Sequence, residues 1–194
     1  LQDNSNFSFL SGEKNSKNII AIMKINGPII SNPENLNNFN IFNNINAIYP
    51  SQIEKFLNEL ETLKIKGLIV SIDSPGGSVF ASNEIYALFK NFKKNNNITL
   101  YFHSSEILAS GAYWVSQSSD KIFASYGSLI GSIGVKGPNW LYYNSPTLFS
   151  NGLIGNTIES PKGIELYSNF AGESKDLFNP FKKPSSKDLS KLQN

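Results

Sequence analysis

The sequence contains no cysteine and a single histidine among its 194 residues. Without cysteine no disulfide can form, and one imidazole leaves too few nitrogen and sulfur ligands for a zinc site. A basic stripe is also missing, because 17 Lys and Arg nearly balance 15 Asp and Glu and are scattered through Asn-rich segments. Binding along a phosphate backbone needs clustered positive charge, so we expect no nucleic-acid partner.

The chain has no long uninterrupted apolar segment. Its longest candidate, residues 19 to 30, is broken by a lysine, an asparagine and the pair Gly27-Pro28. A membrane-spanning helix needs about 20 predominantly apolar residues, so this segment predicts a strand, a turn and a second strand. Because the chain begins at Leu1 rather than Met, we expect that an anchor or signal preceded it and that the remaining chain is soluble.

What is present fits one folded domain between two polar ends. The composition, 40% hydrophobic and 12% aromatic, is sufficient for a single core. Residues 1 to 17 are rich in Ser and Asn without periodicity, which predicts a flexible N-terminal arm. We expect the domain to cover residues 18 to 183. A short, truncated tail follows over residues 184 to 194, with a helix start at Ser185 or Ser186.

Apolar spacing alternates between helical and strand-like inside the domain. Two segments repeat apolar residues every three or four positions, which predicts amphipathic helices, and short β-branched runs predict buried parallel strands. The predicted helices are 51 to 63 and 79 to 92, and the strands are 19 to 25, 67 to 73 and 98 to 104. Strand, helix and strand at this spacing make βαβ crossovers, so we predict an α/β fold with a mainly parallel sheet.

Two regions lack a sustained period. Residues 31 to 46 are Asn-rich and predict a loop. From Gly137 onward aromatic residues alternate with Asn, Pro and Gly, which predicts a hairpin or an extended arm.

Ser110 is the candidate nucleophile. It lies in ILASGAYW, where a strand leads into a helix predicted over residues 109 to 117, before a further strand around residues 121 to 125. A serine at such a junction projects from the carboxyl edge of a parallel sheet, beside the Gly111 N–H at the positive end of the helix. Serine is also a common helix cap, so this segment alone leaves a structural role open.

A second turn, DSPGGS at residues 73 to 78, places two glycines at the end of a central strand. There the backbone can approach a ligand closely and direct an N–H group at a developing oxyanion. Gly77 is the first candidate for that donor, with an ordinary strand-to-helix turn as the alternative. Asp73 and Ser78 are expected to cap the turn and the next helix.

The usual base for a serine is missing. The only histidine, His103, lies inside a strand pattern, and GxSxG is absent because Leu108 stands where its first glycine belongs; both features argue against a Ser/His/Asp triad and an α/β-hydrolase. A lysine can serve if burial lowers its pKa from about 10.4 toward neutrality. Lys175, in GESKDLFNP, has apolar and aromatic neighbours in sequence and is the candidate base.

Together these residues resemble the signal peptide peptidase A family, serine/lysine peptidases related in fold to Clp protease and crotonases. Three motifs stand in the family's order, IDSPGGSVFASNEIY, ILASGAYWVSQSSDKIFASYGSLIGSIGV and GESKDLFNPF. The resemblance covers most of residues 18 to 183. It implies a crotonase/Clp protease-like α/β fold whose mainly parallel sheet is built from repeated ββα units.

The resemblance also implies roles for individual residues. Ser110 is the nucleophile and Lys175 the general base, the amides of Gly77 and Gly111 form the oxyanion hole, and Ser132 orients the lysine. No metal or cofactor is required in this chemistry.

The base is the residue with alternatives. The segment that leads to Lys175 is longer than in simple bacterial members, so Lys162 and Lys182 remain alternative candidates. Relatives continue beyond the position that corresponds to Asn194 with helices and a further strand, so we expect altered or incomplete assembly.

The implied activity is hydrolysis of peptide bonds by a serine endopeptidase. Its expected substrates are cleaved signal peptides or other membrane-associated peptides with apolar segments. The resemblance further implies a homo-oligomer with active sites near subunit interfaces, held at a bacterial-type cell envelope through the upstream anchor. Alternatives are a phage capsid-maturation or membrane quality-control protease of the same fold, a catalytically silent peptide-binding homologue, and a crotonase-type acyl-CoA enzyme.

Overall fold

The chain forms two compact units in the computed structural model, Leu1–Gly131 and Ser132–Asn194. The described residues are 7–32, 46–150, 155–172, 175 and 179–190. Within the first unit the ring of Phe7 packs edge-on against Phe56, with 5.5 Å between ring centroids. The division into an arm, one domain and a tail stays a prediction.

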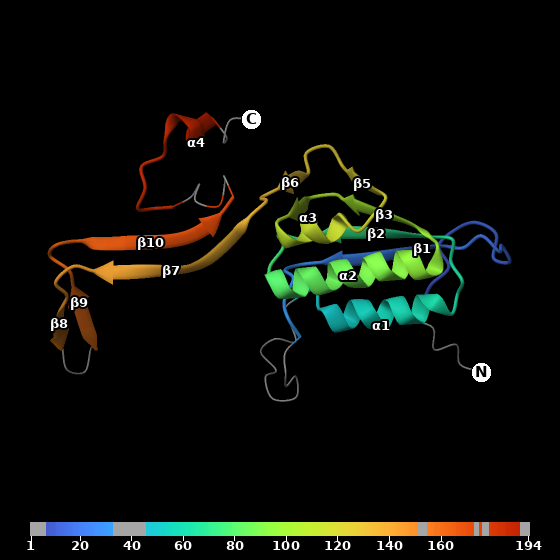
Figure 1. Cartoon of the computed structure of the whole chain (residues 1–194), viewed down its shortest axis with the longest axis horizontal. Helices are drawn as coiled ribbons and strands as arrows, with labels where there is room; N and C mark the ends of the chain where they lie inside the picture. Colours follow the sequence, from blue (N-terminus) through green and yellow to red (C-terminus); the bar gives the residue numbers. More distant parts are fainter. Residues whose placement is uncertain (1–6, 33–45, 151–154, 173–174, 176–178, 191–194) are drawn as a thin grey trace. The chain divides into compact units, whose positions relative to one another are not determined.

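A four-stranded parallel sheet forms the centre of the first unit, in the order β1-β2-β3-β5 (Figure 1). Its strands are β1 (Ile20–Asn26), β2 (Gly67–Asp73), β3 (Thr99–Ser104) and β5 (Lys121–Ala124). The connecting helices are α1 (Pro50–Glu61), α2 (Val79–Asn96) and α3 (Gly111–Ser116). Because the chain adds these strands in one direction, right-handed crossovers bring the helices to one face of the sheet. There α2 packs between α1 and α3.

Short parallel pairings continue beyond the carboxyl ends of the long strands. A three-residue strand, β4 (Ile107–Ala109), pairs with β6 (Leu129–Gly131), and single bridges join Ser74 to Leu108 and Ile29 to Gly77. A long strand, a short extended piece and a helix therefore recur along the chain, as in β3, β4 and α3. The predicted α/β fold with a mainly parallel sheet of repeated ββα units is confirmed.

The helix predicted over residues 109 to 117 is shorter than expected. It begins at Gly111, because Ala109 still belongs to β4. Conversely, α2 continues past the predicted end at Phe92 and stops before Asn97, whose φ of 48° is left-handed. A residue in that conformation is a common helix terminator.

The face of the sheet beneath the helices is the core. Alternate residues of β2, Leu68, Val70 and Ile72, are at most 1% exposed. Phe89 of α2 packs edge-on against Phe102 of β3, with ring centroids 5.2 Å apart. Burying a side chain of this size stabilises the fold by about 1.5–3 kcal/mol. Packing in the core therefore fixes the positions of the long strands, and with them the carboxyl edge of the sheet, where the short strands begin.

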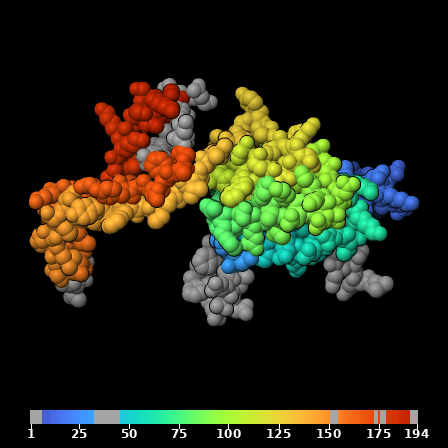
Figure 2. Space-filling view, in the orientation of Figure 1, coloured from blue at the N-terminus to red at the C-terminus, as the bar shows by residue number. Residues whose placement is uncertain are grey.

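The second unit consists of β-ribbons and a short helix. Its strand β7 (Val135–Tyr143) pairs antiparallel with β10 (Ile164–Ala171) in what we call the ribbon. The hairpin of β8 (Thr147–Ser150) and β9 (Asn156–Glu159) extends from the ribbon (Figure 2), and α4 (Ser186–Ser190) follows. The hairpin predicted after Gly137 is confirmed. The predicted loop at 31 to 46 lies almost wholly outside the described residues.

Within the described part of the chain, no helix has both the length and the apolar character needed to span a membrane.

Candidate active site

Ser110 lies where β4 passes into α3. Its N–H donates to the carbonyl oxygen of Gly131 at 2.8 Å. Its φ of 53° and ψ of −123° fall in a sparsely populated region for a residue with a Cβ, which costs about 1–3 kcal/mol. Ser110 occupies the N-cap position, yet its side chain makes no capping hydrogen bond. The interpretation of Ser110 as a simple helix cap is therefore wrong.

The positions packed around Ser110 are glycines, because a side chain at any of them would clash with neighbouring atoms. A Cβ on Gly76 would stand 2.5 Å from the nitrogen of Gly111 and 2.9 Å from the Cβ of Ser110. A Cβ on Gly111 would overlap the hydroxyl of Ser82, and one on Gly77 would overlap the carbonyl of Ile29. The DSPGG turn and the start of α3 thus pack backbone against backbone.

This packing brings the two predicted oxyanion-hole residues together. The nitrogen of Gly77 lies 3.4 Å from the position that a Cβ on Gly111 would take. No acceptor for the N–H of Gly77 or Gly111 is found among the described residues. Gly111 is the first residue of α3, where an N–H group has no partner inside the helix. Two N–H donors from separate segments are thus adjacent to each other and to Ser110.

The second unit contains the predicted base and its orienting residue. The Nζ of Lys175 donates to the Oγ of Ser132 at 3.2 Å. Lys175 is half-buried, and its backbone nitrogen lies 3.5 Å from the carbonyl oxygen of Gly172, to which it donates. Ser132 has a φ of 52°, so like Ser110 it has a positive φ, which is uncommon for a residue other than glycine. The structure brings this pair together inside one unit, and Ser110 belongs to the other.

The alternative bases lie elsewhere in the second unit. Lys162 is in the turn between β9 and β10, and Lys182 is in the segment before α4. His103, in β3, has its Nε2 3.3 Å from the hydroxyl of Ser125. The only histidine is therefore engaged with a serine other than Ser110.

The two capping predictions have different outcomes. Ser78 caps α2 as expected, because its Oγ accepts the N–H of Ala81 at 3.3 Å. Asp73 caps a turn, but not the one that follows it in the sequence. Its Oδ1 accepts hydrogen bonds from the turn between β3 and β4, at residues 104–107.

These hydrogen bonds control the ionisation of Asp73. Burial raises the pKa of its carboxyl, but the N–H of Glu106, the hydroxyl of Ser104, and the N–H groups of Ile107 and Ser105 together outweigh burial. The pKa of Asp73 is therefore below its ordinary value of 3.8. An ionised carboxylate is the better acceptor for four donors.

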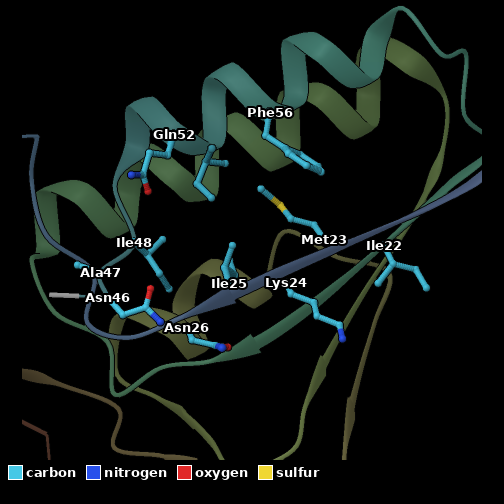
Figure 3. A pocket seen from close by; sticks show the side chains of 11 residues that line it. Ile22, Met23, Lys24, Ile25, Asn26, Asn46, Ala47, Ile48, Gln52 and Phe56 are labelled. Carbon is cyan, nitrogen blue, oxygen red and sulfur yellow. The ribbon is translucent and has the colours of Figure 1, made fainter. Parts of the chain in front are cut away.

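A pocket of about 280 Å³ lies between β1 and the start of α1. Met23, Ile25, Ile48 and Phe56 surround it together with polar side chains such as that of Gln52 (Figure 3). Its lining includes none of the candidate catalytic residues. Over the described part of the chain, no three His, Asp or Glu residues gather in a group that could hold a metal ion.

Comparison with known proteins identifies a family. Residues 91–146, which include Ser110 and Ser132, match the model of peptidase family S49. A protein of Enterococcus faecium provisionally named signal peptide peptidase SppA is 30% identical over 182 residues, covering 94% of this chain and 47% of that protein.

Two further proteins are similar over much of the chain. A protein of Methanocaldococcus jannaschii provisionally named a protease is 30% identical over 159 residues, covering 78% of this chain and 46% of that protein. The chain thus spans about half the length of these curated relatives. A solved structure of a mutant 1510-N membrane-bound stomatin-specific protease aligns with 75% of this chain and 56% of its own, at 20% identity and a TM-score of 0.43.

Proposed function

Because the chain belongs to peptidase family S49, we propose that it contains the catalytic site of a serine endopeptidase with a Ser110/Lys175 dyad. One observation carries the proposal. Ser110 stands in an unusual backbone conformation beside the N–H groups of Gly77 and Gly111, for which no acceptor is found in the described residues. Two preorganised donors next to a serine hydroxyl are what a tetrahedral intermediate of acyl transfer requires.

The chemistry then proceeds in two steps. The neutral amine of Lys175 takes the proton of the Ser110 hydroxyl while the Oγ attacks the peptide carbonyl carbon. The N–H groups of Gly77 and Gly111 donate to the resulting oxyanion. When the intermediate collapses, the C–N bond breaks, the leaving amine takes the proton from the lysine, and an acyl-enzyme remains. Water, deprotonated by the same lysine, hydrolyses the ester and restores Ser110.

Ser132 supports the assignment of Lys175 over the other lysines. Its hydroxyl accepts a hydrogen bond from the Lys175 Nζ, which restricts the rotation of a long and flexible side chain. Ser132 directly follows Gly131, whose carbonyl oxygen accepts the Ser110 N–H. The residue that orients the base is therefore next in sequence to a residue bonded to the nucleophile.

The proposal extends to the substrate and the assembly. We expect substrates to be cleaved signal peptides or other membrane-associated peptides with apolar segments, at a bacterial-type cell envelope. We also expect a homo-oligomer with active sites near subunit interfaces. The ribbon supports this expectation, because its paired residues Trp140 and Tyr167 are 72% and 56% exposed. A two-stranded ribbon is at best marginally stable on its own in water.

The test is intact-mass detection of a covalent adduct with a peptidyl fluorophosphonate. We expect the native chain to gain one adduct, and Ser110→Ala and Lys175→Ala to gain none while remaining folded. Ser125→Ala is the matched control, because Ser125 is the serine that contacts the only histidine. It should be labelled like the native chain. The proposal is contradicted if the adduct is lost in Ser125→Ala and kept in Ser110→Ala. It is also contradicted if the folded native chain gains no adduct.

The alternatives differ in adduct formation, in ligand binding or in the peptides that are cleaved. A catalytically silent peptide-binding homologue gives no adduct but retains binding of an apolar peptide. A crotonase-type acyl-CoA enzyme binds CoA, and its turnover is indifferent to Ser110→Ala. A capsid-maturation or quality-control protease of the same fold gives the same adduct and differs only in the peptides it cleaves.

A further inference from the structure

One oxygen atom at the end of β2 collects hydrogen bonds from an entire turn. The Oδ1 of Asp73 accepts the hydroxyl of Ser104 at 2.8 Å and the N–H groups of Ser105, Glu106 and Ile107 at 3.0, 2.7 and 3.2 Å. These donors lie more than 30 residues further along the chain. A single carboxylate thus determines where β3 ends and where β4 begins.

The same turn anchors the other short strand. The carbonyl oxygen of Glu106 accepts the N–H of Leu129, the first residue of β6, at 2.8 Å. The carbonyl oxygen of Ser104 accepts the N–H of Ser125 and the hydroxyl of Ser128. Because β4 leads to Ser110 and β6 ends at Gly131, both segments that meet at the nucleophile are attached to this turn, β4 by beginning in it and β6 by the hydrogen bond of Leu129.

The turn also sets the register of the oxyanion-hole segment. Ser74, the residue after Asp73, donates its N–H to the carbonyl oxygen of Ile107 at 2.7 Å. Its own carbonyl oxygen accepts the N–H of Ala109 at 3.1 Å. The chain that carries Gly77 is therefore held against the chain that carries Ser110 immediately beside the carboxylate.

We propose that Asp73 is a positioning residue for catalysis, whose carboxylate aligns the segments that carry Gly77, Ser110 and Gly131. It does not touch the substrate, so its effect passes through the turn at residues 104–107. The proposal rests on the serine peptidase function proposed above. A displacement of about 1 Å between a nucleophile and its oxyanion donors can reduce the rate about 100-fold.

Asp120 provides a matched control in the same sheet. Its carboxylate accepts the N–H of Leu100 at 2.9 Å and the ammonium of Lys93 at 3.1 Å. Asp120 is exposed, whereas Asp73 is half-buried, but like Asp73 it has a lowered pKa, mainly because of the Leu100 N–H. Asp120 acts at the amino end of β3, so its loss weakens the sheet without altering the turn at residues 104–107.

The experiment compares variants of the 194-residue chain by fluorophosphonate labelling of Ser110. For Asp73→Ala, Asp73→Asn and Asp120→Ala we measure the maximal labelling rate, the half-saturating probe concentration and the urea unfolding midpoint. Asp73→Ala should lower the maximal rate about 100-fold with the half-saturating concentration unchanged. Asp73→Asn keeps an oxygen at the accepting position but not its charge, so it should recover about tenfold of that loss and remain about tenfold slower than the native chain. Asp120→Ala should lower the midpoint but keep the rate within about twofold.

Each outcome decides one question. An unlabelled native chain contradicts the proposed peptidase and not the role of Asp73. If the native chain is labelled and Asp73→Ala loses no more rate than Asp120→Ala at equal fraction folded, Asp73 has no positioning role. If Asp73→Ala does not fold, Asp73→Asn decides, because a native rate in Asp73→Asn together with a lowered midpoint also overturns the inference.

Discussion

The backbone of Gly76 contacts that of Gly111, so that a Cβ on Gly76 would stand 2.5 Å from the Gly111 nitrogen. This contact joins the turn after β2 to the first residue of α3. It leaves the N–H groups of Gly77 and Gly111 near each other. The proposed oxyanion hole therefore depends on the absence of a side chain at a residue that supplies no donor itself.

Gly76→Ala should abolish labelling of Ser110. Gly76 has a φ of 86°, so alanine there carries about 1–2 kcal/mol of backbone strain in addition to the clash. Gly127→Ala is the control, because Gly127 has a φ of 87° and open space around a Cβ. It should lose about the same strain energy in urea unfolding and keep full labelling. Equal labelling of the two variants would show that the close contact is not needed.

Lys175→Ala should reduce turnover of an apolar fluorogenic peptide to background while the far-UV circular dichroism stays native. Removing a general base costs roughly 100- to 10,000-fold in rate. Lys162→Ala and Lys182→Ala are the matched controls and should keep the native rate within about twofold. Turnover that survives Lys175→Ala and disappears in one of the other two variants would reassign the base.

Sequence patterns predicted the scaffold better than the details of the site. Strand β2 is a nearly continuous apolar run, so it was predicted with its observed bounds, Gly67–Asp73. The three-residue strands β4 and β6 are too short to show a period, and their pairing is visible only in three dimensions. Likewise, nothing near Asp73 in the sequence indicates that its partners lie at residues 104–107, because long-range hydrogen bonds leave no local pattern.

Some candidate site residues could also be recognised from the local sequence, whereas the contacts between them could not. The glycines at 76, 77 and 111 were recognisable as a turn and a helix start, and the structure adds that side chains are excluded at all three positions. The contact between Ser132 and Lys175 joins residues from two separate motifs. Its prediction came from a family resemblance, because spacing alone does not indicate which lysine reaches Ser132.

Acid should reduce the stability that Asp73 contributes. The pKa of Asp73 is lowered in the folded chain from an ordinary value of 3.8, so its contribution is complete above that value, which applies to the unfolded chain, and is lost as the pH falls through the folded pKa. The urea midpoint of the native chain should therefore exceed that of Asp73→Asn at about pH 7, and the difference should shrink toward about pH 3. The other carboxylates titrate in both proteins, so their effects on the two midpoints cancel in the difference. A difference that is independent of pH would contradict an ionised, hydrogen-bonded Asp73.

Weakening the ribbon should lower the oligomeric state. Trp140 and Tyr167 face each other across β7 and β10 and are both exposed, and exposed apolar surface of this kind is typical of a protein interface. Trp140→Ser should shift sedimentation toward the monomer and reduce turnover in parallel, if active sites lie near the subunit contacts. Tyr126→Ser, which removes a fully exposed aromatic ring from the first unit, should change neither. An unchanged sedimentation profile for Trp140→Ser would exclude the ribbon as the contact. Native turnover in a monomeric Trp140→Ser would show instead that each chain completes its own active site.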